Sequence, residues 1–379
     1  MEEWKEYKLG DILNFRRGHD LPHSKMKDGN IPVAGSNGII GYHNEATPVS
    51  PCITIGRSGN VGTPYIYKQC WAHNTVLYVD DFKQNDPLYL YYLLKTLPLS
   101  SFGGGSAVPT LNRNHIHPLI IKHTPNINTQ RQIASILKSL DDKIEVNRRI
   151  NDNLEQQAQA LFKSWFVDFE PFKDGEFVES ELGIIPKGWK AGSLEDITTQ
   201  KAERVGDRVD MKVLSPVTSG QLMLSEEYFT KQVFSESIAK YKVVEIGDFA
   251  YNPARVNIGS LGRNNYDFNG CVSPVYVVFS CKDGYAHLFD LYRKTEKFKS
   301  EVNLRAIGGV RQSLNYKDFA FIQCIIPPLY VVEEFNAIYG HILVMQKYIG
   351  EENDRLASLR DTLLPRLMSG ELKVEDVTL

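Results

Sequence analysis

The sequence predicts an α+β protein made of two tandem domains, each followed by a long helix. Three observations support this prediction. Parts of the chain recur in the same order, short β-like runs fill each repeat, and a long helical pattern closes each one. With 379 residues the chain also exceeds one ordinary hydrophobic core. We expect the two helices to pair as an antiparallel coiled coil and the repeat to be pseudo-twofold.

The internal repeat appears as several short matches. Residues 4–12 (WKEYKLGDI) and 189–197 (WKAGSLEDI) are identical at five of nine positions, at an offset of 185. The shared order and slowly drifting offset of the matches indicate a tandem duplication. The further matches pair residues 74–79 with 273–278, residues 110–112 with 313–315, and residues 151–154 with 353–356.

Each globular part is rich in Gly, Pro, Asn and aromatic residues, and short apolar runs alternate with turn signals such as Asn37-Gly38 and Asn269-Gly270. The predicted strands include residues 52–55, 75–79, 275–279 and 321–326. The predicted boundaries are a first domain at 1–128, a helix at 129–168, a linker at 169–188, a second domain at 189–330, a second helix at 331–370 and a tail at 371–379.

The two helical segments carry apolar residues at alternating spacings of three and four, the a/d pattern of a coiled coil. Asn147, Asn151 and Glu352 interrupt this seam, and polar residues at such positions commonly set register. Two ordinary amphipathic helices, each packed on its own domain, are the alternative. The expected seam consists of Ile133, Leu137, Leu140, Ile144, Leu154 and Leu161 in the first helix, and Phe335, Ile338, Ile342, Ile349, Leu356, Leu359 and Leu363 in the second.

Composition and charge narrow the class of protein. The hydrophobic fraction of 42% is ordinary for a soluble protein, and no stretch approaches the roughly 18 apolar residues of a membrane span. Five scattered cysteines without a C-x-x-C pair predict a reduced, cytoplasmic protein with no metal site. Residues 1–128 carry 12 Lys and Arg against 10 Asp and Glu, and residues 180–330 carry 19 against 17. Both domains are therefore slightly basic, although the whole chain has a formal net charge of −3 at pH 7.

No catalytic motif is complete. Residues 252–255 (NPAR) resemble the Asn-Pro-Pro-aromatic motif of adenine methyltransferases but lack the second proline and the stacking aromatic. The glycine-rich residues 56–62 lack the Gly-Lys-Ser/Thr of a phosphate-binding loop. No group of carboxylates or histidines has hydrolase or metal-ligand spacing. We therefore predict neither catalytic residues nor a metal.

Three stretches of the chain resemble the specificity subunits of type I restriction-modification enzymes. Residues 161–171 (LFKSWFVDFEP) are similar to the central conserved region of that family, and residues 182–189 (LGIIPKGW) to the start of its second domain. Residues 363–372 (LLPRLMSGEL) resemble its second conserved region. Pro125 followed by residues 130–134 (QRQIA) resembles the sequence with which the long helices of that family usually begin. The start of the second long helix in this chain departs from that sequence. The resemblance covers essentially the whole chain.

The resemblance implies a non-catalytic DNA-specificity subunit. Each domain is then a target recognition domain for one half of an asymmetric, interrupted site in double-stranded DNA. The helical pair fixes the spacer and docks two modification subunits, which bind S-adenosylmethionine and methylate adenine at N6. This chain itself binds no cofactor, and added restriction (translocase-nuclease) subunits cut unmethylated DNA. A helix of about 38 residues at about 1.5 Å each is roughly 57 Å long, or about 17 base pairs.

Two alternatives remain open from the residues alone. One is a coiled-coil scaffold whose domains bind protein instead of DNA. The other is a specificity subunit of a methylation-only system without a nuclease.

The candidate DNA-contacting residues come from glycine-containing loops that carry Arg, Asn, Gln, Ser or His, the types that contact base edges and phosphates. Arg57 and Arg255 each precede a turn containing glycine and are expected to occupy comparable places. The candidates are Arg16, Arg17, Arg57, Ser58, Asn60, His73, Asn74, Asn112 and Arg113 in the first domain, and Arg255, Asn257, Arg263, Arg305, Arg311 and Gln312 in the second.

Overall fold

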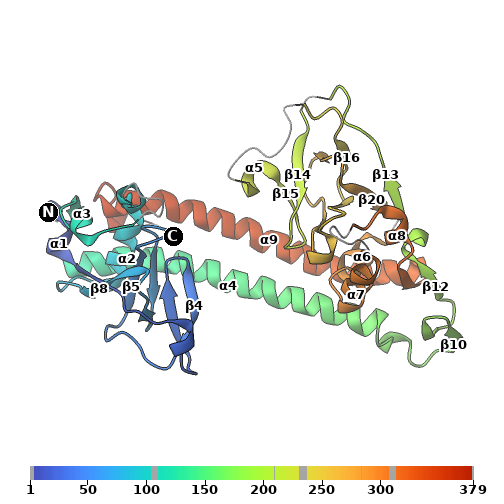
Figure 1. The fold of residues 1–379 in the computed structure, drawn as a ribbon, viewed down its shortest axis with the longest axis horizontal. Coiled ribbons are helices and arrows are strands. Elements are labelled where there is room, and N and C mark those ends of the chain that lie inside the picture. The colour runs from blue at the N-terminus through green and yellow to red at the C-terminus, as the bar shows by residue number, and fades with distance from the viewer. Residues whose placement is uncertain are drawn as a thin grey trace. The chain divides into compact units, whose positions relative to one another are not determined.

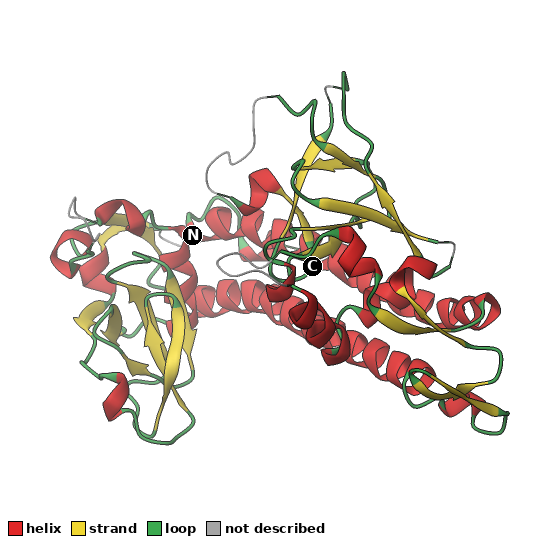
Figure 2. Cartoon of the chain, turned by 45° about the vertical axis from the view of Figure 1, so that its right-hand side comes forward, coloured by secondary structure: helices red, strands yellow, loops and turns green. Residues whose placement is uncertain are grey.

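The computed structural model describes residues 4–103, 110–208, 210–229, 237–282, 284–306 and 313–377. The chain forms two compact units. The first unit comprises Met1–Arg149 and Ile349–Leu379, and the second comprises Ile150–Tyr348. Two helices of 40 residues, α4 (Ile127–Phe166) and α9 (Leu329–Met368), each contribute one end to each unit (Figure 1). Apart from a two-stranded hairpin within residues 177–186, the strands belong to the globular domains that precede these helices (Figure 2).

The first unit contains a two-stranded, a four-stranded and a three-stranded sheet. The four-stranded sheet has the order β2-β8-β5-β6 and is antiparallel throughout, whereas β3 pairs antiparallel with β4 and parallel with β7. The strands are β1 (Lys5–Lys8), β2 (Asn14–Arg17), β3 (Ile31–Gly35), β4 (Gly38–His43), β5 (Cys52–Gly56), β6 (Pro64–Tyr67), β7 (Trp71–Ala72), β8 (Val76–Asp81) and β9 (Ile120–His123), with β1 paired to β9. The short helices are α1 (Leu9–Ile12), α2 (Pro87–Thr96) and α3 (Arg113–Ile116).

The core of the first unit is built by both halves of the chain. Alternation along β5 turns Ile53 and Ile55 toward this core and Cys52 toward the three-stranded sheet. The same core contains Leu137 of α4 and Leu367 of α9, both fully buried. The first domain therefore completes its core with residues from the far end of the sequence.

The second unit repeats this plan. Its described strands form two four-stranded sheets, β13-β20-β17-β18, which is antiparallel throughout, and β15-β14-β19-β16, and two two-stranded sheets, β10-β11 and β12-β21. The strands are β10 (Phe177–Ser180), β11 (Gly183–Pro186), β12 (Lys190–Ser193), β13 (Thr198–Lys201), β14 (Lys212–Pro216), β15 (Leu222–Leu224), β16 (Lys242–Val244), β17 (Phe249–Tyr251), β18 (Leu261–Arg263), β19 (Gly270–Val272), β20 (Val277–Cys281) and β21 (Gln323–Ile326). The short helices are α5 (Ser225–Tyr228), α6 (Ala286–Tyr292), α7 (Glu296–Arg305) and α8 (Tyr316–Ala320).

The two domains share one topology, which confirms the duplication. β12 pairs with β21 as β1 pairs with β9, and β14 pairs antiparallel with β15 and parallel with β19 as β3 does with β4 and β7. The predicted match of residues 74–79 with 273–278 is wrong by one residue. Val79 and Phe279 both face the main core of their unit, so the structural offset of this strand is 200. A shift of one residue would turn the strand's side chains to the opposite face.

The long helices are antiparallel neighbours within each unit. In the first unit Asp141 pairs with Arg360 at 2.7 Å, and Asn147 donates to Glu352 at 2.6 Å, so positions rise on α4 as they fall on α9. In the second unit the rings of Trp165 and Phe335 are 5.8 Å apart. The α4 residues of the expected seam are buried or half-buried.

On α9 the expected seam is only partly correct. Phe335, Ile342, Ile349, Leu356 and Leu363 face inward as expected. Ile338 and Leu359 do not, since 45% and 41% of their surface is exposed. The inward positions are occupied one residue later by Tyr339 and Arg360. The seam therefore keeps its heptad spacing, but some of its positions hold polar or aromatic residues beside exposed apolar ones.

Both tryptophans at the domain starts pack against other parts of their unit. Trp189 is buried, and its ring lies 5.9 Å from that of Phe166 at the end of α4 and 5.1 Å from that of Phe172. Trp4 lies against Gly370, directly after α9. These contacts join the β-rich domain of each unit to a helix end.

Candidate nucleic-acid interface

In the first domain, three loops meet at one end of the four-stranded sheet. They are residues 18–20 after β2, residues 57–63 after β5, and residues 73–75 before β8. The Arg57 amide donates to the Thr75 carbonyl at 2.8 Å, and the Gly18 amide donates to the Val76 carbonyl at 3.0 Å. The segment before α3 joins them, because the Leu111 amide donates to the Arg57 carbonyl at 2.7 Å. The fold thus brings most of the first-domain candidates together.

Arg17 and Arg57 stand out within this group. Neither guanidinium has a hydrogen bond or ion pair to a side chain among the described residues of the unit. Burial, and then the charge of Arg17, lower the pKa of Arg57. Two neighbouring cations without a carboxylate partner form a site for an anion such as a phosphate, or for the acceptor atoms of a guanine edge.

The other polar candidates of the first domain hold the loops in shape. Their bonds are Asn74 to Asp20 at 2.6 Å, His73 to Thr75 at 3.0 Å, and Thr63 to Asn60 at 3.2 Å. Asn112 caps α3 by accepting from the Asn114 amide at 3.0 Å, Arg113 donates to the Phe15 carbonyl at 3.0 Å, and Arg16 pairs with Asp80 at 3.3 Å. Burial lowers the pKa of His73, and the charge of Asp20 opposes that shift. The predicted set therefore divides into loop-supporting residues and an unpaired arginine pair.

The second domain has the corresponding loops. Residues 252–260 follow β17 as residues 57–63 follow β5. The Leu314 amide donates to the Pro253 carbonyl at 3.0 Å, as Leu111 does to Arg57. Pro253, not Arg255, is thus the structural equivalent of Arg57. Arg255 lies in the same loop, two positions further on, and its side chain is exposed.

A basic cluster in the second domain was missed by sequence reasoning. Arg204 and Lys242 form an isolated bridge between their backbones, and the Lys242 Nζ donates to the Tyr276 carbonyl at 2.6 Å. Burial, and then the charge of Arg204, lower the pKa of Lys242. Burial raises the pKa of Tyr276, and the charge of Arg255 opposes that rise. Arg204, Lys242 and Arg255 therefore gather around the turn that precedes β20.

The remaining second-domain candidates have other surroundings. The Arg263 Nε donates to the Gly247 carbonyl at 3.3 Å, and its Nη1 lies 2.9 Å from the Nδ1 of His287. Arg305 pairs with Glu301 at 3.3 Å. Arg263 and Arg305 thus have structural partners. Arg311 and Gln312 lie outside the residues that the structure describes.

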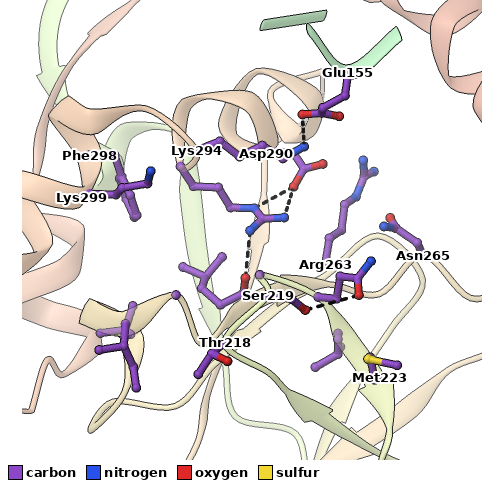
Figure 3. Close-up of a pocket in the computed structure, with 18 of the residues that line it drawn as sticks. Glu155, Thr218, Ser219, Met223, Arg263, Asn265, Asp290, Lys294, Phe298 and Lys299 are labelled. Carbon is purple, nitrogen blue, oxygen red and sulfur yellow. Dashed lines mark hydrogen bonds and ion pairs between the residues drawn. The ribbon is translucent and has the colours of Figure 1, made fainter. Parts of the chain in front are cut away.

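A cavity of about 1000 Å³ lies in the second unit (Figure 3). Its lining includes Asn257, apolar residues such as Leu222 and Phe298, and charged side chains that already have partners. Lys294 pairs with Glu155 of α4 at 2.7 Å, and the Arg293 Nη1 donates to the Leu261 carbonyl at 2.9 Å. The cavity lies where the second domain meets the helices, and the Lys294–Glu155 pair joins the two. Across the described ranges, no cluster of three or more His, Cys, Asp or Glu residues could hold a metal.

The part of α9 in the second unit carries exposed apolar side chains. Tyr330, Ile338, Val344, Met345 and Tyr348 are all exposed, although they belong to a long, well-packed helix. A concentration of large apolar side chains on one exposed element is typical of a protein-binding surface. No described helix is long and apolar enough to cross a membrane.

Comparisons with known proteins agree with the fold. Residues 1–156 match the family model described as the type I restriction modification DNA specificity domain. The MjaIX specificity subunit of Methanocaldococcus jannaschii is 29% identical over 308 residues, covering 76% of this chain and 70% of that protein. The HindI specificity subunit of Haemophilus influenzae is 26% identical and covers 98% of this chain and 100% of that protein. The fold is also similar to the crystal structure of the type I restriction-modification S subunit from M. genitalium. The aligned region covers 97% of this chain and 96% of that one, with a TM-score of 0.60 and 14% sequence identity.

Proposed function

Because the chain belongs to the specificity subunits of type I restriction-modification systems, we propose that it selects the DNA site on which such a complex acts. Each domain recognises one half of a bipartite, asymmetric sequence. The observation that carries this proposal is the pair of equivalent loops after β5 and β17, each of which lies near a group of cations. These cations are Arg17 and Arg57 in the first domain, and Arg204, Lys242 and Arg255 in the second. These cations supply phosphate contacts and, through arginine, bidentate contacts to guanine.

The chain performs no chemical step itself. Two modification subunits bind S-adenosylmethionine and methylate adenine at N6, and restriction subunits join them in the full complex. The exposed apolar side chains of α9 support a docking role for the helices. We place the complex in the cytoplasm, where it meets DNA.

The helices also set the spacer between the half-sites. At about 1.5 Å per residue, a 40-residue helix is roughly 60 Å long, close to the length of 17 base pairs of B-DNA. Inserting one heptad into α4 alone is expected to misalign the helical seam and abolish assembly. An unchanged spacer with normal assembly would contradict this part of the proposal.

The test is adenine methylation mapped by single-molecule sequencing in cells that express this chain with its modification subunit. We expect one interrupted motif that disappears when the gene is deleted. Arg57→Ala is expected to relax or weaken one half of the motif, and Arg255→Ala the other. Lys83→Ala, which changes an exposed lysine paired with Asp81, serves as the control.

The alternative is a scaffold whose domains bind protein instead of DNA. It predicts normal expression and assembly with no motif that depends on this chain. Equal relaxation of both half-sites by either single arginine substitution would contradict the assignment of one half-site to each domain, without contradicting DNA recognition by the chain. The family relationship favours the DNA-specificity role.

A further inference from the structure

Two cysteines of the first unit lie in direct contact. The Sγ atoms of Cys52 and Cys70 are 2.8 Å apart, and neither residue is in a disulfide. Both side chains are fully buried. The other three cysteines, Cys271, Cys281 and Cys324, belong to the second unit, and none of them has a sulfur contact to another cysteine within the described ranges.

The pair connects the two larger sheets of the first domain. Cys52 is the first residue of β5 in the four-stranded sheet, and Cys70 immediately precedes β7 in the three-stranded sheet. Hydrogen bonds fix the backbone beside Cys70, since its carbonyl accepts from the Thr47 amide at 2.9 Å. The Ala72 amide donates to the Thr47 hydroxyl at 2.9 Å. The thiols are therefore held together by the sheets that carry them.

The surroundings of the pair are apolar. Ala34, Ala72, Val76 and Tyr78 pack around the two sulfurs. The hydrogen bond with Cys52, and then burial, raise the pKa of the Cys70 thiol. Cys70 is thus protonated at neutral pH, and because the thiolate is the form that attacks a peroxide, oxidation of this pair is slow and is favoured by the contact of the two sulfurs, not by an activated thiol.

We propose that Cys52 and Cys70 form an oxidative modification site, at which a small peroxide converts the two thiols into one intramolecular disulfide. One sulfur attacks hydrogen peroxide, which gives a sulfenic acid and one water. The second thiol then attacks that sulfur and releases a second water as the S–S bond forms. The two sulfurs lose two electrons, which reduce the peroxide, and a thiol reductant reverses the step.

The position of the disulfide determines what it changes. It closes residues 52–70 into a loop, and this loop contains Arg57, Ser58 and Asn60. Because the sulfurs already touch, the bond forms by a small closing movement and leaves the strands in place. Oxidation therefore constrains the segment that carries the first domain's candidate DNA contacts, whereas the second domain is unaffected.

The test uses the full-length chain treated with hydrogen peroxide and then labelled with N-ethylmaleimide under denaturing conditions. The reduced chain takes five labels, one for each cysteine. We expect the oxidised chain to take three labels, with residues 52 and 70 linked in peptide mapping, and dithiothreitol to restore all five. Cys52→Ala and Cys70→Ala are expected to keep four labels after oxidation, whereas Cys324→Ala still forms the link and takes two.

Thermal unfolding provides a second measurement. A native disulfide across a loop of this size is expected to raise the unfolding temperature of the first unit by on the order of 5–10 °C. Cys70→Ala removes that rise. Five labels on the peroxide-treated native chain, a link between other cysteines, or a lower unfolding temperature after oxidation would each overturn the proposal. None of these measurements depends on DNA binding, so they are separate from the test of the proposed function.

Discussion

Replacing Leu359 and Arg360 by alanine, one at a time, tests which face of α9 packs on α4 in the first unit. Hydrophobic patterning favours Leu359 as the inward residue, but the structure turns Arg360 inward. Arg360 Nη1 donates to Asp141 Oδ1 at 2.7 Å, and Asp141 Oδ2 accepts from the Tyr92 hydroxyl at 2.8 Å. The network therefore joins α9, α4 and α2.

The two substitutions are expected to lower the free energy of unfolding by different amounts, because Arg360 is hydrogen-bonded and mostly buried whereas Leu359 is exposed. Arg360→Ala removes a hydrogen bond between charged groups, a type worth about 1.5–3 kcal/mol, and leaves Asp141 with Tyr92 and water. Since the two side chains are 21% and 28% exposed, solvent screening reduces this toward about 1.5–2 kcal/mol. A fully buried leucine would cost about 2–5 kcal/mol on truncation to alanine. Leu359 is 41% exposed, so we expect Leu359→Ala to lower the free energy of unfolding by less than about 1 kcal/mol.

The assay is urea denaturation of the full chain, combined with hydrogen exchange of peptides from α4 around Asp141. Hydrogen exchange localises the loss to the first unit, since a chain of two units need not unfold in one step. The Asp141→Ala and Arg360→Ala double-mutant cycle is expected to give a coupling of about 1 kcal/mol or more. A larger loss of stability from Leu359→Ala than from Arg360→Ala would refute the assigned helix register.

Three further predictions concern the first unit. Burial lowers the pKa of His123 from 6.5 to about 4, so only the unfolded chain binds this proton between those values. Stability is expected to fall by on the order of 1–3 kcal/mol as the pH drops from 6.5 to about 4, and His123→Gln should flatten that slope in pH-dependent urea melts. Gly370 has φ +72°, and an added Cβ would lie 2.5 Å from the Trp4 indole. Gly370→Ala should therefore lower the unfolding temperature more than Gly188→Ala, where φ is also positive but no atom lies within 4 Å; equal effects would exclude the clash. Arg17→Ala should reduce the slope of log affinity against log salt by about 1 in DNA-binding titrations, whereas Arg16→Ala, whose side chain is paired with Asp80, should leave it unchanged.

The sequence was most informative where one physical rule dominates. Apolar residues at spacings of three and four placed the inward face of α4, because nearly every inward position there is apolar or a small amide. On α9 the same rule selected Ile338 and Leu359, which are exposed. The inward positions beside them hold Tyr339 and Arg360, whose aromatic or charged side chains find partners that hydrophobicity alone does not reveal.

The candidate interface was predictable only in part. Glycine-containing loops with arginine selected Arg57 as a candidate, and the structure brings its loop together with those of residues 18–20 and 73–75. Arg204 and Lys242 were missed because they come from separate segments that meet only through strand pairing. The contact of Cys52 with Cys70 is likewise a product of sheet packing, since the residues are 18 positions apart and carry no spacing motif. Such proximities depend on the tertiary fold.

The shared core of the first unit has a consequence for the order in which the protein matures on the ribosome. The first domain is synthesised first, but Leu363, Leu364 and Leu367, which complete its core, are translated after the whole second domain. The second unit, Ile150–Tyr348, thus has all of its residues before the first unit does. Until the end of α9 emerges, the nascent first domain exposes the apolar surface that this helix later covers. Interrupting translation within α9 is therefore expected to leave the earlier-made domain as the aggregation-prone one.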